Sequence, residues 1–136
     1  MNDKARLFFL IASIIVGFDA AGAFASRLLH FDYGDLIPVT FCLYGFCGYL
    51  GFRDERLLGG FLAGLMAGMS DSTLGWAAST AIHPYTKEPN SPWSVLLVSS
   101  TVVVVTLVAG CVGFIGAVIS SGISLMQAKW KGTPPS

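Results

Sequence analysis

Residues 57–82 read LLGGFLAGLMAGMSDSTLGWAASTAI and contain one charged side chain, Asp71. Drawn as an α-helix, this stretch exceeds the roughly 20 residues that cross the hydrocarbon core of a bilayer. Three other apolar stretches, residues 7–29, 36–52 and 93–126, can each form a helix of about 17 residues or more. The sequence therefore predicts an all-α fold, a four-helix transmembrane bundle.

The composition indicates the same class. Charged residues make up 12% of the 136 residues, against about 25% in a usual soluble domain, and hydrophobic residues make up 54%. No stretch remains for a soluble catalytic or sensor domain, so we expect residues 1–136 to be one integral membrane domain and not an enzyme. The formal net charge is zero and no basic run is present, which argues against nucleic acid and leaves the lipid bilayer as the first partner.

The lysines and arginines indicate the orientation. Six of the eight precede the first stretch, separate the second from the third, or follow the fourth, while Arg27 and Lys87 lie in the other two connections. Cytoplasmic loops carry the excess of such residues. We therefore predict an integral protein of a bacterial-type cytoplasmic membrane with both termini in the cytoplasm.

The first apolar stretch also resembles a secretory signal peptide, with a basic start, an apolar core and residues 23–25, AFA, as a cleavage pattern. A signal core tolerates the charged Asp19 poorly, and the same segment recurs later in the chain. We therefore expect this stretch to be retained as a membrane span.

That recurrence suggests an internal repeat. Polar residues of the first stretch recur in order in the third, with one residue inserted after the aspartate and one removed after the histidine: Asp19, Gly22, Ser26, His30 and Tyr33 correspond to Asp71, Gly75, Ser79, His83 and Tyr85. The second and fourth stretches share a glycine pattern at identical spacing, with Gly45, Gly48 and Gly51 matching Gly110, Gly113 and Gly116. We predict two tandem helical hairpins, residues 1–52 and 53–136, related as a parallel repeat about the membrane normal; chance similarity in a glycine-rich chain is the alternative.

Two aspartates inside the apolar stretches are the main candidates for function. Counted from Leu7 and Leu57 at the rise of an α-helix, Asp19 and Asp71 lie about 18 and 21 Å into a core about 30 Å thick. A charged carboxylate at the bilayer centre costs roughly 2.5–3.5 kcal/mol, so such a residue marks a functional site by default. Two carboxylates close together can share a proton or bind a cation.

The spacing within each span decides which residues share a face with the aspartates. In the first span the polar positions are three or four apart and stay on one helical face. In the third they are all four apart and drift around the helix, so either Ser72 or an adjustment of the helical turn would compensate. The predicted intramembrane polar site consists of Asp19, Asp71, Ser26 and Ser79. The alternative is that each aspartate only joins helices, through Ser70, Ser72, Thr73 or a helix backbone.

A second, outer-boundary site rests on the only two histidines, His30 and His83, at equivalent positions of the repeat. Two imidazoles can ligate a haem or, with Asp32 and Asp35, a metal ion. A common origin and the preference of amphipathic rings for the membrane interface explain the pair as well, and their spacing matches no zinc pattern. We therefore expect no cofactor and keep bis-His haem or metal binding as a third hypothesis.

Small residues recur every fourth position in the third and fourth stretches, in the manner of a glycine zipper. The helix-packing positions are Gly60, Gly64, Gly68, Gly113 and Gly116. Such faces let helices approach closely in lipid, where the hydrophobic effect contributes little to their association. More of them are present than one four-helix subunit needs, so we expect a homo-oligomer or a larger membrane complex.

Two functions follow from these features. The first is a small transporter or an ion- or proton-conducting subunit that uses the paired aspartates. The second is a non-catalytic accessory or scaffold subunit of a membrane complex, which packs against partner helices through its small-residue faces.

Overall fold

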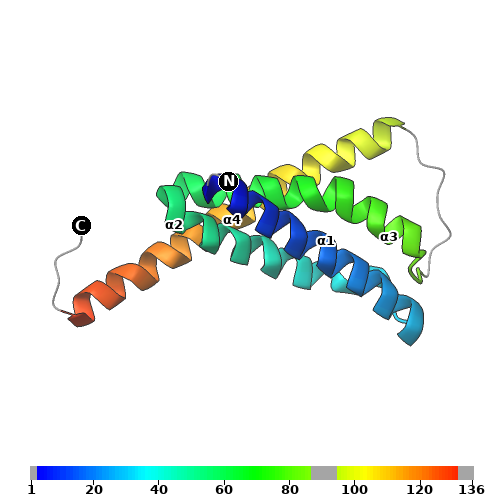
Figure 1. Cartoon of the computed structure of the whole chain (residues 1–136), viewed down its shortest axis with the longest axis horizontal. Helices are drawn as coiled ribbons and strands as arrows, with labels where there is room; N and C mark the ends of the chain where they lie inside the picture. The colour runs from blue at the N-terminus through cyan, green and yellow to red at the C-terminus, as the bar shows by residue number, and fades with distance from the viewer. Residues whose placement is uncertain (1–2, 87–94, 132–136) are drawn as a thin grey trace.

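The computed structural model describes residues 3–86 and 95–131. The regular elements of these ranges are all helical (Figure 1), namely α1 (Asp3–Leu29), the 3-10 helix η1 (Tyr33–Leu36), α2 (Ile37–Ser70), the π-helical turn η2 (Asp71–Gly75), α3 (Trp76–Ile82) and α4 (Val95–Lys131). The predicted all-α class is confirmed.

Four helical segments are long and apolar enough to cross a membrane. They are Ala5–Leu29, Tyr33–Arg53, Arg56–Ile82 and Ser99–Gln127. The predicted number of spans is confirmed, and the bounds of the first three differ from the predicted ones by at most three residues. The predicted start of the fourth span, residue 93, lies outside the described residues. By helix length and composition, the chain is an integral, multi-pass membrane protein.

Two of these spans, Tyr33–Arg53 and Arg56–Ile82, share α2, which folds back on itself. The backbone carbonyl of Gly59 and the side chain of Ala63 lie against Gly51, a proximity that a straight helix cannot provide. The reversal occurs at residues 53–56, where Arg56 adopts a left-handed backbone conformation with φ of 55°. In Figure 1 this reversal is the teal-to-green turn labelled α2. We call residues 37–53 the first arm of α2 and residues 56–70 its second arm.

Backbone-to-backbone contacts between glycines join α4 to both arms of α2. Gly113 of α4 lies between Gly48 of the first arm and Gly60 and Gly64 of the second. The other predicted packing positions lie in the same contacts, Gly68 against Ala109 and Gly116 against Gly45. An added Cβ at each of these glycines except Gly45 would overlap the neighbouring helix, so the absence of a side chain allows this separation.

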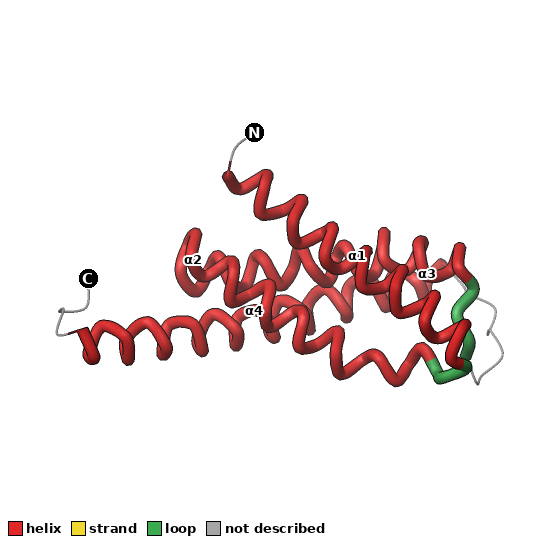
Figure 2. Tube along the Cα trace, turned by 60° about the horizontal axis from the view of Figure 1, so that its bottom comes forward, coloured by secondary structure: helices red, strands yellow, loops and turns green. Residues whose placement is uncertain are grey.

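The last turns of α4 extend beyond the reversal of α2 (Figure 2). The start of α1, the reversal of α2 and the end of α4 lie toward one end of the molecule, and the end of α1, η1 and the end of α3 lie at the other (Figures 1 and 2). The four spans therefore alternate in direction along the chain.

Larger side chains hold α1 to the rest of the bundle. Ile11 and Ile15 are buried against Tyr44 and Cys47 of the first arm of α2. Toward its C-terminus α1 packs on η2 and α3. Within the described ranges, no Cα atom of α1 lies within 8 Å of a Cα atom of α4. The two arms of α2, with η2 and α3, therefore separate α1 from α4.

Candidate functional site

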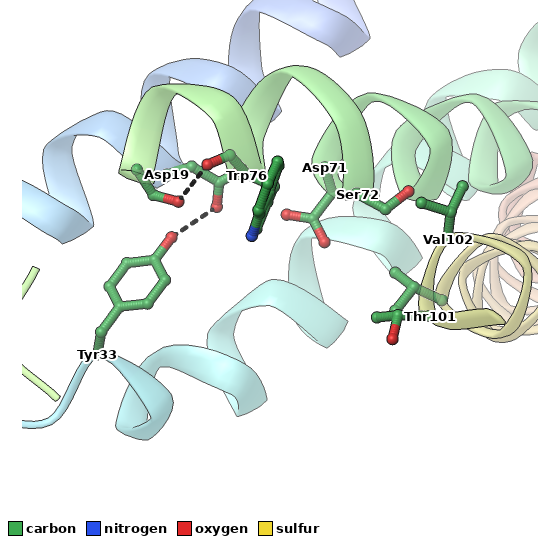
Figure 3. A pocket seen from close by; sticks show the side chains of 9 residues that line it. Asp19, Tyr33, Asp71, Ser72, Trp76, Thr101 and Val102 are labelled. Carbon is green, nitrogen blue, oxygen red and sulfur yellow. Dashed lines mark hydrogen bonds between the residues drawn. The ribbon is translucent and has the colours of Figure 1, made fainter. Parts of the chain in front are cut away.

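A cavity of about 200 Å³ lies where α1, η1, η2, α3 and α4 approach one another. Its walls combine carboxylates, hydroxyls, two aromatic rings and aliphatic side chains (Figure 3), contributed by Asp19, Tyr33, Asp71, Ser72, Trp76, Ser79, Thr101, Val102 and Val105. The structure thus brings both predicted aspartates and Ser79 to one cavity. Asp19 lies ten residues before the end of its span and Asp71 eleven before the end of the other, so both are about 15–17 Å from the same end of the bundle.

Asp19 is buried, with 4% of its surface exposed. Its Oδ1 accepts a hydrogen bond of 3.2 Å from the Tyr33 hydroxyl (Figure 3). Its Oδ2 is also buried and accepts no hydrogen bond from the residues that the structure describes. A Cβ on Gly75 would overlap this oxygen, so the glycine lets the backbone of η2 approach the carboxylate.

Asp71 belongs to the π-helical turn η2 and accepts a hydrogen bond from the hydroxyl of Tyr44. Tyr44 is buried in the first arm of α2, so this bond joins the first arm to η2. The Asp71 carboxylate also interacts electrostatically with that of Asp19. Each aspartate thus accepts a hydrogen bond from one tyrosine, and both carboxylates line the same cavity.

The serine and threonine that follow Asp71 were considered above as hydrogen-bond partners of the aspartates, but their hydroxyls bond to the helix backbone. The hydroxyl of Ser72 donates to the carbonyl of Gly68 at 2.7 Å, and that of Thr73 to Met69 at 2.6 Å. These are bonds to the preceding turn of the same helix, which short hydroxyl side chains readily form. They attach the π-helical turn to α2, whereas tyrosines from other segments hold the aspartates.

Of the two alternatives for the third span, the structure shows an adjusted turn, the π-helical turn η2, Asp71–Gly75, and Ser72 within it also lines the cavity. A π turn accommodates one extra residue in an α-helix and often occurs at functional sites. The extra residue coincides with the insertion after Asp71 in the sequence comparison of the first and third spans. It lets Asp71, Gly75 and Ser79 all face α1 or the cavity.

The two predicted serines have different surroundings. Ser79 lines the cavity and donates to the carbonyl of Trp76 at 3.0 Å. Ser26 is fully buried near the end of α1, where its hydroxyl lies 2.9 Å from the carbonyl of Phe31 and 3.1 Å from that of Tyr85. Ser26 thus joins the end of α1 to the segment after α3, outside the set of residues that lines the cavity.

The two histidines occupy corresponding positions, each at the C-terminal end of a helix. His30 follows α1 and His83 caps α3, both exposed and both left-handed, with φ of 55° and 57°. Among the described residues, no group of three or more His, Cys, Asp or Glu side chains could hold a metal ion. Asp32, considered as a metal partner, accepts a hydrogen bond from the backbone N–H of Gly34 and caps η1. Haem binding by the two imidazoles stays a prediction.

Sequence reasoning missed the roles of Tyr44 and Trp76 and named Tyr33 only as a position of the internal repeat. A signal was present for Tyr44, because a tyrosine within an apolar span needs an acceptor for its hydroxyl. Which acceptor it reaches depends on helix rotation, which the sequence pattern does not determine. The Trp76 ring lies beside the Asp71 carboxylate in the wall of the cavity (Figure 3).

No protein-family model, curated protein or solved structure matches this chain.

Proposed function

We propose that this chain is a small membrane transport protein, in which Asp19 and Asp71 bind a proton or a small monovalent cation during its passage through the bilayer. The observation that carries the proposal is that carboxylates from two separate helices line one cavity within the predicted spans. Their depth follows from the helix bounds, about 15–17 Å from one end of the bundle.

The charge of the site supports this proposal. A carboxylate removed from water is unfavourable unless it is paired, hydrogen-bonded or neutralised. The tyrosine hydroxyls supply one hydrogen bond to each aspartate, which leaves Oδ2 of Asp19 without a partner among the described residues. A proton shared between the carboxylates, or a cation between them, would satisfy that oxygen and reduce the negative charge of the pair.

The size of the cavity supports a small ligand. A volume of about 200 Å³ is well above the 10–15 Å³ or so that one water needs on this kind of measure. The cavity can therefore hold several waters, or a cation with part of its hydration shell. Hydroxyls of Ser72 and Ser79 lie in its wall and provide further oxygen atoms near the carboxylates.

Flux measurements on reconstituted protein test the proposal. Purified wild type, Asp19→Asn and Asp71→Asn would be placed in liposomes, and proton, Na⁺ and K⁺ flux recorded with matched protein content. Asp35→Asn is the control, because Asp35 is an exposed aspartate of η1 outside the cavity. We expect flux to fall at least tenfold in both cavity variants and to stay unchanged in the control. Wild-type flux in both cavity variants would refute the assignment.

A duplicated hairpin is part of the same proposal. Its support is that His30 and His83 both end their helices in a left-handed conformation, that η2 coincides with the inserted residue, and that the equivalent glycines Gly48 and Gly113 meet. With an even number of spans, both termini would face one side. The reversal of α2 lies toward that end too (Figure 1), and it carries Arg53 and Arg56, which favours the cytoplasmic side.

The accessory-subunit alternative rests on a different observation. Within the described residues no Cα atom of α1 lies within 8 Å of a Cα atom of α4, although both helices contribute to the cavity wall. A partner helix, or a second copy of the chain, could pack against both helices at the cavity. Mass measurement of the protein extracted in mild detergent tests this alternative: a homogeneous monomer that still conducts would contradict it, and a defined complex that dissociates in Asp19→Asn would support it.

A further inference from the structure

A second, larger groove lies toward the end of the bundle where α2 reverses. It has a volume of about 1000 Å³ and runs between the turn of α2 and the last turns of α4. The turn contributes Arg53 and Arg56, both exposed, and α4 contributes the hydroxyl of Ser121 and the amide of Gln127. The groove therefore presents two guanidinium groups beside uncharged hydrogen-bonding groups.

This polar groove continues into an apolar one. A neighbouring groove of about 600 Å³ is lined by Leu57, Leu58, Phe61, Cys111, Phe114 and Ile115. Leu57 and Leu58 line both grooves. The polar groove and the apolar groove thus meet along one side of the second arm of α2.

The position in the membrane matches this change in polarity. Arg53 ends one candidate span, Arg56 begins the next and Gln127 ends the fourth. The polar groove therefore lies at the boundary of the apolar layer, at the depth of phospholipid headgroups. The apolar groove extends from it toward the middle of the spans, at Phe61 and Cys111.

We propose that the two grooves together bind one anionic phospholipid, with its phosphate on Arg53 and Arg56 and an acyl chain along the apolar groove. Planar guanidinium groups bind phosphate oxygens through paired N–H donors, and basic pockets between membrane helices bind such headgroups. This site is separate from the Asp19–Asp71 cavity, and the proposal does not depend on transport. The turn also carries Asp54 and Glu55, so the test compares anionic with zwitterionic lipid.

Lipid titration of the full-length protein in detergent, read by native mass spectrometry, tests the proposal. The probes are phosphatidylglycerol, phosphatidylcholine with the same acyl chains, and inorganic phosphate. We expect phosphatidylglycerol to bind more tightly than phosphatidylcholine, and Arg53→Gln and Arg56→Gln each to weaken it about fivefold, the effect of one basic residue near a lipid surface. Arg6→Gln removes the same charge from the start of α1, outside the grooves, and should have no such effect.

Three results would overturn the proposal. The first is equal affinity for the two lipids, and the second is unchanged phosphatidylglycerol binding in both glutamine variants. The third is inorganic phosphate competing as well as the lipid, which would identify a site for a free anion. The double variant with Arg53→Lys and Arg56→Lys keeps the charge and should retain the preference for anionic lipid. Retained binding in this variant would show that the glutamine variants lose binding through the loss of charge and not through misfolding.

Discussion

Gly113→Ala should weaken the bundle through the contact between α4 and α2. A Cβ built on Gly113 lies 2.7 Å from the carbonyl oxygen of Gly60, 2.7 Å from Cα of Gly64 and 3.0 Å from its backbone nitrogen. Ordinary van der Waals contact of a Cβ begins at 3.4 Å, so α4 and the second arm would have to separate by about 0.7 Å. All three neighbours are backbone atoms, which cannot move aside as a flexible side chain does.

Gly17→Ala provides the matched control for this variant. Gly17 is an exposed glycine of α1, and a Cβ there would meet nothing within 4 Å. Both substitutions gain the same helix propensity, at most about 1 kcal/mol, so the difference between them isolates the steric term. Overpacking of a well-packed core typically destabilises by about 1–3 kcal/mol. The separation would also weaken dispersion along the interface, because a gap of 0.5–1 Å or so forfeits a quarter to a half of each contact.

The assay is unfolding in mixed micelles with increasing SDS, followed by far-UV circular dichroism. We expect Gly113→Ala to unfold at lower SDS than wild type, with a free energy of unfolding about 1–3 kcal/mol below that of Gly17→Ala. Equal stability of the two alanine variants would refute the reasoning, because it would mean that α2 and α4 do not depend on backbone contact at Gly113.

Three further substitutions test individual contacts. Gly75→Ala places a Cβ against Oδ2 of Asp19, so cation or proton flux should fall while far-UV circular dichroism stays that of the wild type; undiminished flux would contradict the cavity geometry. Tyr44→Phe removes the hydroxyl that donates to Asp71. It should lower the free energy of unfolding by about 1–3 kcal/mol, the usual result of leaving a buried acceptor unpaired. The SDS titration of this variant is compared with that of Tyr49→Phe. His83→Gly relieves a left-handed residue with φ of 57° and should raise the SDS midpoint, by up to about 1 kcal/mol in stability; a lower midpoint would show that the imidazole itself is required.

The number and approximate ends of the spans were predictable because they depend on local quantities. A bilayer sets a minimum length for an apolar helix, and four stretches of the sequence meet it. Pro38 in the first turn of α2 is equally local, since proline lacks the N–H that a first turn leaves unbonded. The reversal within α2 was predictable too, because Arg53 and Arg56 separate the second apolar stretch from the third.

The partners of the aspartates could not be predicted in the same way. Asp71 bonds to Tyr44, 27 positions earlier in the chain, and Asp19 to Tyr33, 14 positions later. The internal repeat would have paired Asp71 with Tyr85, yet the backbone carbonyl of Tyr85 instead accepts from the N–H of Tyr33. Such contacts depend on how each helix is rotated about its axis, and hydropathy constrains rotation weakly when most of a helix surface is apolar.

The packing of the bundle places the two carboxylates on segments that are held differently. Asp71 follows the second arm of α2, which glycine backbone contacts fix against α4 at Gly60 and Gly64. Asp19 lies on α1, which packs through larger side chains such as Ile11 and Ile15 and has no Cα atom near α4 in the described ranges. Contacts between rigid backbones tolerate little displacement, whereas side-chain contacts can adjust by changes of rotamer. Any change in the separation of the two carboxylates is therefore expected to occur by movement of α1 relative to the α2–α4 unit.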